Sequence, residues 1–195
     1  MNQAPLWLKI AYTVLVAVIV PIYWVRYGPA NFLWFSDIAF VLLVPALWWQ
    51  SRLIVSMMAL SVLLLEIVWN VDFFVRLLSG WKIVGLSNYM FDAKLPVWLR
   101  ALSLFHLILP PLLIWLLYRW GYEPRALLGQ TLLAWVILPL SYWFSTPDNN
   151  VNWTKGFGDQ PQTWMPPLVF LLLLMIGFPL VLYVSGHFIL KRLFG

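Results

Sequence analysis

Three ionisable side chains lie inside stretches of this chain that are otherwise almost wholly apolar: Asp37, Glu66 and His106. The ordinary pKa of a histidine, about 6.5, suits a general base at neutral pH. A carboxylate can orient the imidazole, and a serine hydroxyl such as Ser36 can be the nucleophile that it activates. These residue types predict acid–base or nucleophilic chemistry, with His106, Ser36 and Asp37 as candidate catalytic residues.

The same residues also have a structural interpretation. Carboxylates and imidazoles inside membrane helices form hydrogen bonds and ion pairs that hold one helix against another. A serine in such a helix commonly donates its hydroxyl back to its own helix. Sequence leaves both interpretations open for Asp37, Glu66, His106 and Ser36.

Composition determines which elements must carry these groups. Of 195 residues, 63% are hydrophobic and only 10% are charged. Soluble domains contain about 25% charged residues, so the lipid bilayer must solvate most of this surface. A membrane-spanning helix needs about 20 apolar residues, and six of them use nearly the whole chain. We therefore predict one domain, an all-α polytopic integral membrane protein with a bundle of six transmembrane helices.

Breaks in the apolar pattern define the expected elements. Gly28-Pro29 and Gln50-Ser51-Arg52 flank the second span, and an alternation of polar and apolar residues after Val71 is too polar to cross a membrane. We expect spans at residues 6–25, 32–49, 53–71, 97–118, 126–144 and 167–190, an interfacial segment at 72–96, and a polar loop at 145–161.

The depth of the polar residues follows from the helical rise of 1.5 Å per residue. Asp37 and Glu66 are each expected ~8 Å from the non-cytoplasmic ends of their spans, and His106 ~14 Å from the end of its own. This clustering predicts a polar pocket in the non-cytoplasmic half, where Asp37 or Glu66 pairs with Arg100 or His106. The other pocket residues expected there are Glu66, Asn70, Arg100, Ser103, Tyr142 and Asn31.

Loop charges orient the bundle and limit its partners. Lys and Arg are equally numerous on the two sides, but those on the side of the termini lie in very short segments, where they have most influence. We therefore expect both termini in the cytoplasm, in the plasma (inner) membrane of a bacterium. The net charge is +5, and the longest basic run is Lys191-Arg192, so we expect membrane lipids and no nucleic acid as partners.

Cofactor chemistry has little support in the sequence. The chain has no cysteine, which excludes disulfides, thiol catalysis and cysteine-held metal centres. Its two histidines, His106 and His187, are expected at different depths, and neither has a partner histidine three or four residues away. We therefore expect no metal and no cofactor.

Two stretches resemble a known group of membrane enzymes. They are Asn31-Phe32-Leu33-Trp34-Phe35-Ser36-Asp37 and Leu95-Pro96-Val97-Trp98-Leu99-Arg100, which precedes His106. Together they are similar to the androgen-induced/ADTRP-like intramembrane lipid hydrolases and, more loosely, to the YwaF-like membrane proteins, over about half of the chain. The resemblance implies a six-helix bundle that hydrolyses fatty-acid esters of hydroxy fatty acids, with His106 in the histidine position. The hydrolases' threonine corresponds to Trp34, so Ser36 would have to replace it.

These observations lead to one functional expectation and two alternatives. The first is an intramembrane hydrolase or acyl-transfer enzyme that acts on lipid esters, with His106 as base, Ser36 as nucleophile, and Asp37 or Glu66 orienting the imidazole. The alternatives are a non-catalytic protein that binds or transports a lipid or other small molecule, and an accessory membrane subunit.

Overall fold

The computed structural model describes residues 3–146, 149–157 and 161–195, and all the regular elements in these ranges are helical. The all-α fold class is therefore confirmed. The elements are α1 (Leu6–Tyr27), η1 (Pro29–Leu33), α2 (Phe35–Trp49), α3 (Arg52–Ser79), η2 (Asn88–Phe91), α4 (Val97–Leu102), α5 (Phe105–Trp120), α6 (Ala126–Phe144), η3 (Val151–Trp153), α7 (Pro167–Gly177), η4 (Phe178–Tyr183) and α8 (Val184–Phe194). Of the short elements, η4 is a π-helical segment and the others are 3₁₀ turns.

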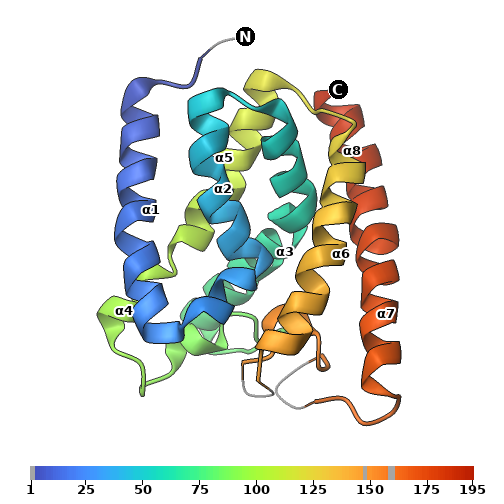
Figure 1. Cartoon of the computed structure of the whole chain (residues 1–195). Helices are drawn as coiled ribbons and strands as arrows, with labels where there is room; N and C mark the ends of the chain where they lie inside the picture. The colour runs from blue at the N-terminus through green and yellow to red at the C-terminus, as the bar shows by residue number, and fades with distance from the viewer. Residues whose placement is uncertain (1–2, 147–148, 158–160) are drawn as a thin grey trace.

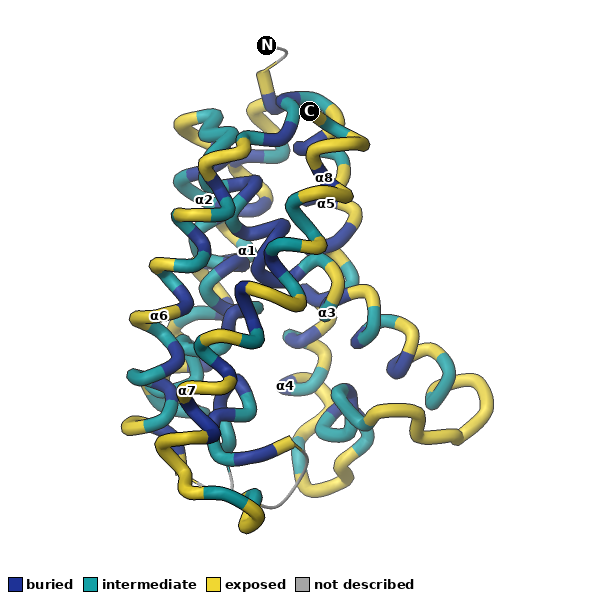
Figure 2. The backbone as a smooth tube through the Cα atoms, turned by 90° about the vertical axis from the view of Figure 1, so that its right-hand side faces the viewer, coloured by how far each residue is buried: buried dark blue, intermediate teal, exposed yellow. Residues whose placement is uncertain are grey.

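The long helices run up and down through one bundle, and both termini lie at the same end (Figure 1). Helix α3 is central, because it packs against α2, α5 and α6. The hydrophobic core lies between these helices and includes Phe40, Leu43, Met58, Leu113 and Leu138, which are all fully buried. Figure 2 shows the buried residues on the inner sides of the helices and exposed residues on their outer sides.

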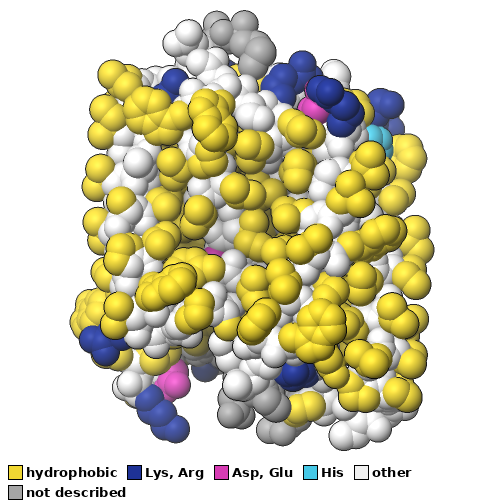
Figure 3. Space-filling model, viewed as in Figure 1, with side chains coloured by type: hydrophobic (Ala, Val, Ile, Leu, Met, Phe, Trp, Pro, Cys, Tyr) yellow, Lys and Arg dark blue, Asp and Glu magenta, His cyan; other side chains and the backbone are white. Residues whose placement is uncertain are grey.

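The outer surface is apolar over most of its height, as a membrane protein requires. Within the described residues, five helical stretches are long and apolar enough to cross a bilayer: Leu6–Tyr27, Arg52–Ser79, Val97–Trp120, Ala126–Phe144 and Pro167–Phe194. Helix α2 is also apolar but has only 15 residues. Figure 3 shows a broad hydrophobic surface, with the basic side chains near its upper and lower ends. The structure is therefore compatible with an integral membrane protein.

Helix α3 is longer than the predicted span, which ended at residue 71. It continues to Ser79 and ends at Gly80, whose φ of 77° suits a glycine. Polar Asp72 is accommodated in this extension because its carboxylate accepts backbone N–H bonds from Val84, Gly85 and Ser87. These bonds fold the segment after α3 back onto the helix, whose last turns lean away from the bundle in Figure 2.

Helix α2 begins three residues later than predicted, after the 3₁₀ turn η1. The side chain of Asn152, from the polar loop, holds this start in place. Its Oδ1 accepts the Phe35 N–H at 3.2 Å, and its Nδ2 donates to the Leu33 carbonyl at 2.7 Å and to Ser141 Oγ at 2.9 Å. One side chain thus satisfies a free N–H at the start of α2 and ties the helix to α6.

Candidate functional site

The centre of the candidate site is a direct contact between Glu66 of α3 and His106 of α5. His106 Nδ1 lies 2.8 Å from Glu66 Oε2 and 3.0 Å from Glu66 Oε1. Both residues are buried, with 3% and 9% of their surfaces exposed. The carboxylate fixes which ring nitrogen carries a proton, because a carboxylate accepts the Nδ1–H bond. In the described part of the chain no protein group bonds to His106 Nε2, so this nitrogen is free to exchange a proton.

The position of His106 depends on a break between α4 and α5. Helix α4 ends at Leu102, Ser103 and Leu104 form a turn, and α5 starts at Phe105, so His106 lies in the first turn of a new helix. Its ring stacks on Trp69 of α3, with 4.5 Å between the ring centroids, and on Phe105, at 4.2 Å. The rings of Trp69 and Phe105 therefore restrict how the imidazole can turn.

Asn70 fixes the main chain of His106. In a regular helix the His106 carbonyl would accept from the N–H of Pro110, which proline does not have. Asn70 Nδ2 supplies this bond from α3 at 2.9 Å and also donates to the Glu66 carbonyl at 2.7 Å. Asn70 was predicted as a pocket residue, and the structure places it directly beside both members of the pair.

Asp37 lies in the first turn of α2 and is 6% exposed. It is close enough to His106 and Glu66 for their charges to interact. Among the described residues, no hydrogen bond or ion pair to its carboxylate is formed. The three ionisable residues predicted from three separate helices therefore share one region, but only Glu66 and His106 touch.

Hydroxyl groups form the other polar side of this region. Tyr23 Oη of α1 lies 2.7 Å from Ser103 Oγ, and Tyr89 of η2 is close enough to interact with the same serine. Both tyrosines are close enough to Asp37 for an electrostatic interaction. Ser103 was predicted from the sequence as a pocket residue, but Tyr23, Tyr89 and Trp69 were not. Tyrosine and tryptophan near span ends are typical of the aromatic belt at the membrane interface, so their types and positions did not predict a role in the site.

Four further predicted residues stand apart from the Glu66–His106 pair. Arg100 donates to the Met90 carbonyl at 2.7 Å and forms no ion pair within the described chain. Ser36 is half-buried, and no hydrogen bond between it and His106 is seen among the described residues. Asn31 contributes main-chain bonds within η1, and the Tyr142 ring lies 4.5 Å under the Lys155 ammonium in the loop after α6.

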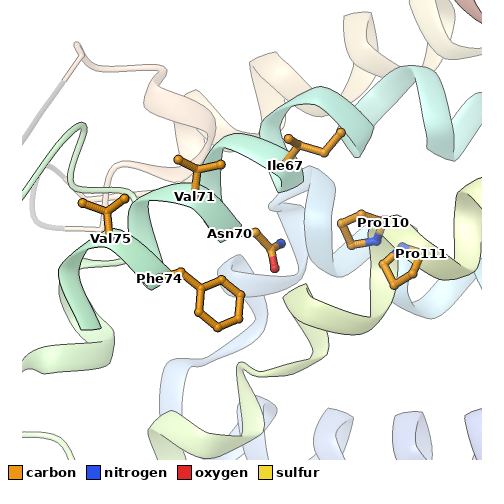
Figure 4. Close-up of a pocket in the computed structure, with 7 residues that line it drawn as sticks. All are labelled: Ile67, Asn70, Val71, Phe74, Val75, Pro110 and Pro111. Atoms are coloured by element: carbon orange, nitrogen blue, oxygen red, sulfur yellow. The ribbon is translucent and has the colours of Figure 1, made fainter. Parts of the chain in front are cut away.

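Two grooves reach this region from the outer surface. One, of about 400 Å³, lies between α3 and α5; Figure 4 shows Asn70 and the proline pair Pro110-Pro111 on its two sides. The other, of about 360 Å³, lies between α1, α2 and α6 and has Asp37 in its wall. The remaining lining of both grooves is apolar. Each groove therefore connects the apolar outer surface to one polar residue of the site.

The donor set is suited to proton transfer more than to metal binding. Within residues 3–146, 149–157 and 161–195, no group of three His, Asp or Glu side chains is placed to hold a metal ion. Glu66 and His106 provide an oriented base, and Asp37 provides a second acid–base group nearby. No protein-family model, curated protein or solved structure matches the chain.

Proposed function

We propose that the chain is an intramembrane enzyme that hydrolyses lipid esters or transfers their acyl groups, with His106 as its general base. The observation that carries the proposal is the 2.8 Å contact between Glu66 and His106 Nδ1, which leaves Nε2 without a protein partner in the described chain. A carboxylate on Nδ1 and a free Nε2 is the arrangement by which an imidazole takes and returns a proton in acyl transfer.

Water is the nucleophile in this proposal, because no hydrogen bond links Ser36 to His106 in the described structure. Nε2 accepts a proton from water while the water oxygen bonds to the ester carbonyl carbon. The bond from this carbon to the alcohol oxygen then breaks, and the leaving oxygen takes the proton back from the imidazolium. Glu66 stabilises the imidazolium in between. In acyl transfer, a second alcohol replaces the water.

The grooves support a lipid as the substrate. Their walls are apolar and they open on the outer side of the bundle, where the acyl chains of a bilayer would lie. A volume of about 400 Å³ is near the lower end for ligand sites, which favours a single chain over a two-chain lipid. A lipid ester would thus approach the site sideways, at Asn70 or Asp37, without leaving the membrane.

We also propose six membrane passes, with α2 as the shortest and both termini in the cytoplasm. Helix α2 lies between α1 and α3 in the bundle, and the turn η1 extends it at the start (Figure 1). The chain has no cysteine, so single cysteines can report sidedness. Trp49→Cys should react with an impermeant maleimide only from the cytoplasmic side, and Lys94→Cys only from the other. Labelling of both from one side would contradict six passes.

A second candidate function is non-catalytic binding or transport of a lipid or small molecule. Two observations favour it. No hydrogen bond links Ser36 to His106 among the described residues, and other polar side chains, such as those of Asn70 and Arg100, donate to main-chain carbonyls of the protein itself. An accessory subunit would need only these internal bonds. Neither alternative requires the free Nε2 of His106.

Turnover separates the candidates. Purified protein would be incubated with long-chain esters of fatty acids and hydroxy fatty acids, and the released acid quantified. His106→Ala should abolish release, Glu66→Gln should lower it by about 10²–10⁴-fold, as expected for a damaged general base, and Ser36→Ala should leave it close to wild type. His187→Ala is the matched control, since it removes the other histidine. Release that persists in His106→Ala would refute the proposal, and loss in Ser36→Ala would restore serine as the nucleophile.

A further inference from the structure

The groove between α1, α2 and α6 has a property that ester hydrolysis does not use. Its wall contains the Asp37 carboxylate, which is 94% buried by its 6% exposure and has no hydrogen-bond partner among the described residues. An isolated carboxylate in apolar surroundings is very costly, so it either takes up a proton or binds a partner. In its ionised form Asp37 therefore needs a partner from outside the described chain.

The charges around Asp37 define what that partner is. Two carboxylates, Asp37 and Glu66, face a single imidazole, and Glu66 occupies its Nδ1. When all three groups are ionised, the cluster carries one net negative charge. Neither Arg100 nor Arg26 forms an ion pair with it in the described part of the chain: Arg100 donates to the Met90 carbonyl, and the Arg26 guanidinium lies over the Trp98 ring. The first turn of α2, where Asp37 lies, also favours a negative charge. The missing partner is thus a cation.

Aromatic rings in the same groove narrow the choice of cation. Trp24 of α1 and Phe32 of η1 line the groove with Asp37, and their ring centroids are 6.0 Å apart. A carboxylate beside aromatic faces is the combination that binds ammonium groups, through ion pairing and cation–π attraction. The rest of the lining, which includes Val20, Val41 and Ile137, is aliphatic.

We propose that this groove binds a single-chain amphiphile with an ammonium headgroup, which places its nitrogen at Asp37 beside the Trp24 and Phe32 rings and its alkyl chain along the aliphatic wall. The volume of about 360 Å³ accommodates one chain. Binding here requires no turnover, so this site and the proposed hydrolysis can fail separately.

The test compares amphiphiles that share a tail and differ in headgroup charge. Wild-type protein in dodecyl maltoside micelles would be titrated with hexadecyltrimethylammonium, 1-hexadecanol or hexadecyl sulfate, and bound ligand would be counted by native mass spectrometry. We expect the ammonium compound to bind at least about tenfold more tightly than the alcohol, and the sulfate least.

Variants locate the site. Asp37→Asn keeps the size of the side chain and should remove the preference for ammonium over alcohol, while binding of the alcohol shows that the groove is still folded. Asp92→Asn is the matched control, because Asp92 is an exposed acid on the same half of the molecule and should leave the preference unchanged. Trp24→Leu should weaken ammonium binding and spare the alcohol. Equal affinities in wild type, a preference that survives Asp37→Asn, or no binding of any amphiphile would each overturn the proposal.

Discussion

Asn70 of α3 donates to the main-chain carbonyl of His106 on α5, the carbonyl that Pro110 leaves without a helical partner. The proline thus creates a free acceptor in an apolar environment, and a neighbouring helix satisfies it. The residue whose carbonyl is exposed in this way is the candidate general base. A defect in the α5 backbone and the placement of the imidazole are therefore coupled.

The first prediction tests this coupling. Asn70→Ala removes two hydrogen bonds and leaves the His106 carbonyl unsatisfied, so the free energy of unfolding should fall by about 1–2 kcal/mol, within the range for such losses. In a Pro110→Ala background the helix supplies its own N–H, and the cost of Asn70→Ala should drop clearly. Unfolding in mixed sodium dodecyl sulfate micelles, followed by circular dichroism, measures the stability of wild type, of each single variant and of the double variant. An equal cost in both backgrounds would show that the carbonyl does not depend on Asn70.

The second prediction concerns the Glu66–His106 pair. His106→Leu leaves the Glu66 carboxylate buried without a partner, and we expect a loss of about 3 kcal/mol, as for breaking a buried pair. Glu66→Leu with His106→Leu removes both charges, and stability should return to within about 1 kcal/mol of wild type, since apolar residues often replace buried pairs without loss. The same micelle unfolding assay applies. A double variant less stable than His106→Leu would mean that the two side chains contribute independently.

The Glu66–His106 pair shows which part of the site could be predicted from the sequence. Depth along each span follows from the rise per residue, and it correctly placed Asp37, Glu66 and His106 in one half of the bundle. The rotation of each helix about its axis does not follow from depth. That rotation decides that Glu66, and not Asp37, contacts His106, and that Arg100 turns to the Met90 carbonyl.

Long-range polar contacts explain the other differences. The predicted bounds of α6 match the structure because an apolar run with polar ends defines them locally. The end of α3 could not be predicted from a local pattern. A charged residue such as Asp72 indicates the end of a span, and only its long-range bonds with the N–H groups of Val84, Gly85 and Ser87 show that the helix continues. The role of Asn152 at the start of α2 depends likewise on residues more than 100 positions away.

The third prediction concerns this asparagine. Asn152 has a φ of 52°, a left-handed conformation that asparagine and glycine adopt more readily than alanine. Asn152→Ala should lower the free energy of unfolding through both lost bonds and backbone strain. Asn152→Gly should be less harmful by about 1 kcal/mol, because it loses the same bonds but adopts the left-handed conformation without strain. Both should expose the loop after α6 to trypsin at Lys155. Ser141→Ala removes one of the three bonds and should have the smallest effect; equal effects of Ala and Gly would exclude a contribution from strain.

The last prediction uses the opposite end of the bundle, where Tyr122, in the loop between α5 and α6, bonds to His187 Nδ1 of α8 at 2.8 Å. Burial, reinforced by the negative charge of Glu123, raises the pKa of Tyr122 to about 12. The phenol therefore stays protonated at neutral pH, where it keeps its hydrogen bond to His187. The unfolded chain, with an ordinary tyrosine pKa near 10, releases its proton first as pH rises, so the contribution of Tyr122 to stability is complete below pH 10 and declines from there towards pH 12. Tyr122→Phe should be less stable than wild type at pH 8, and the difference should shrink between pH 10 and 12. Micelle unfolding across this range measures it, and a difference that stays constant with pH would mean that the phenol ionises equally in both states.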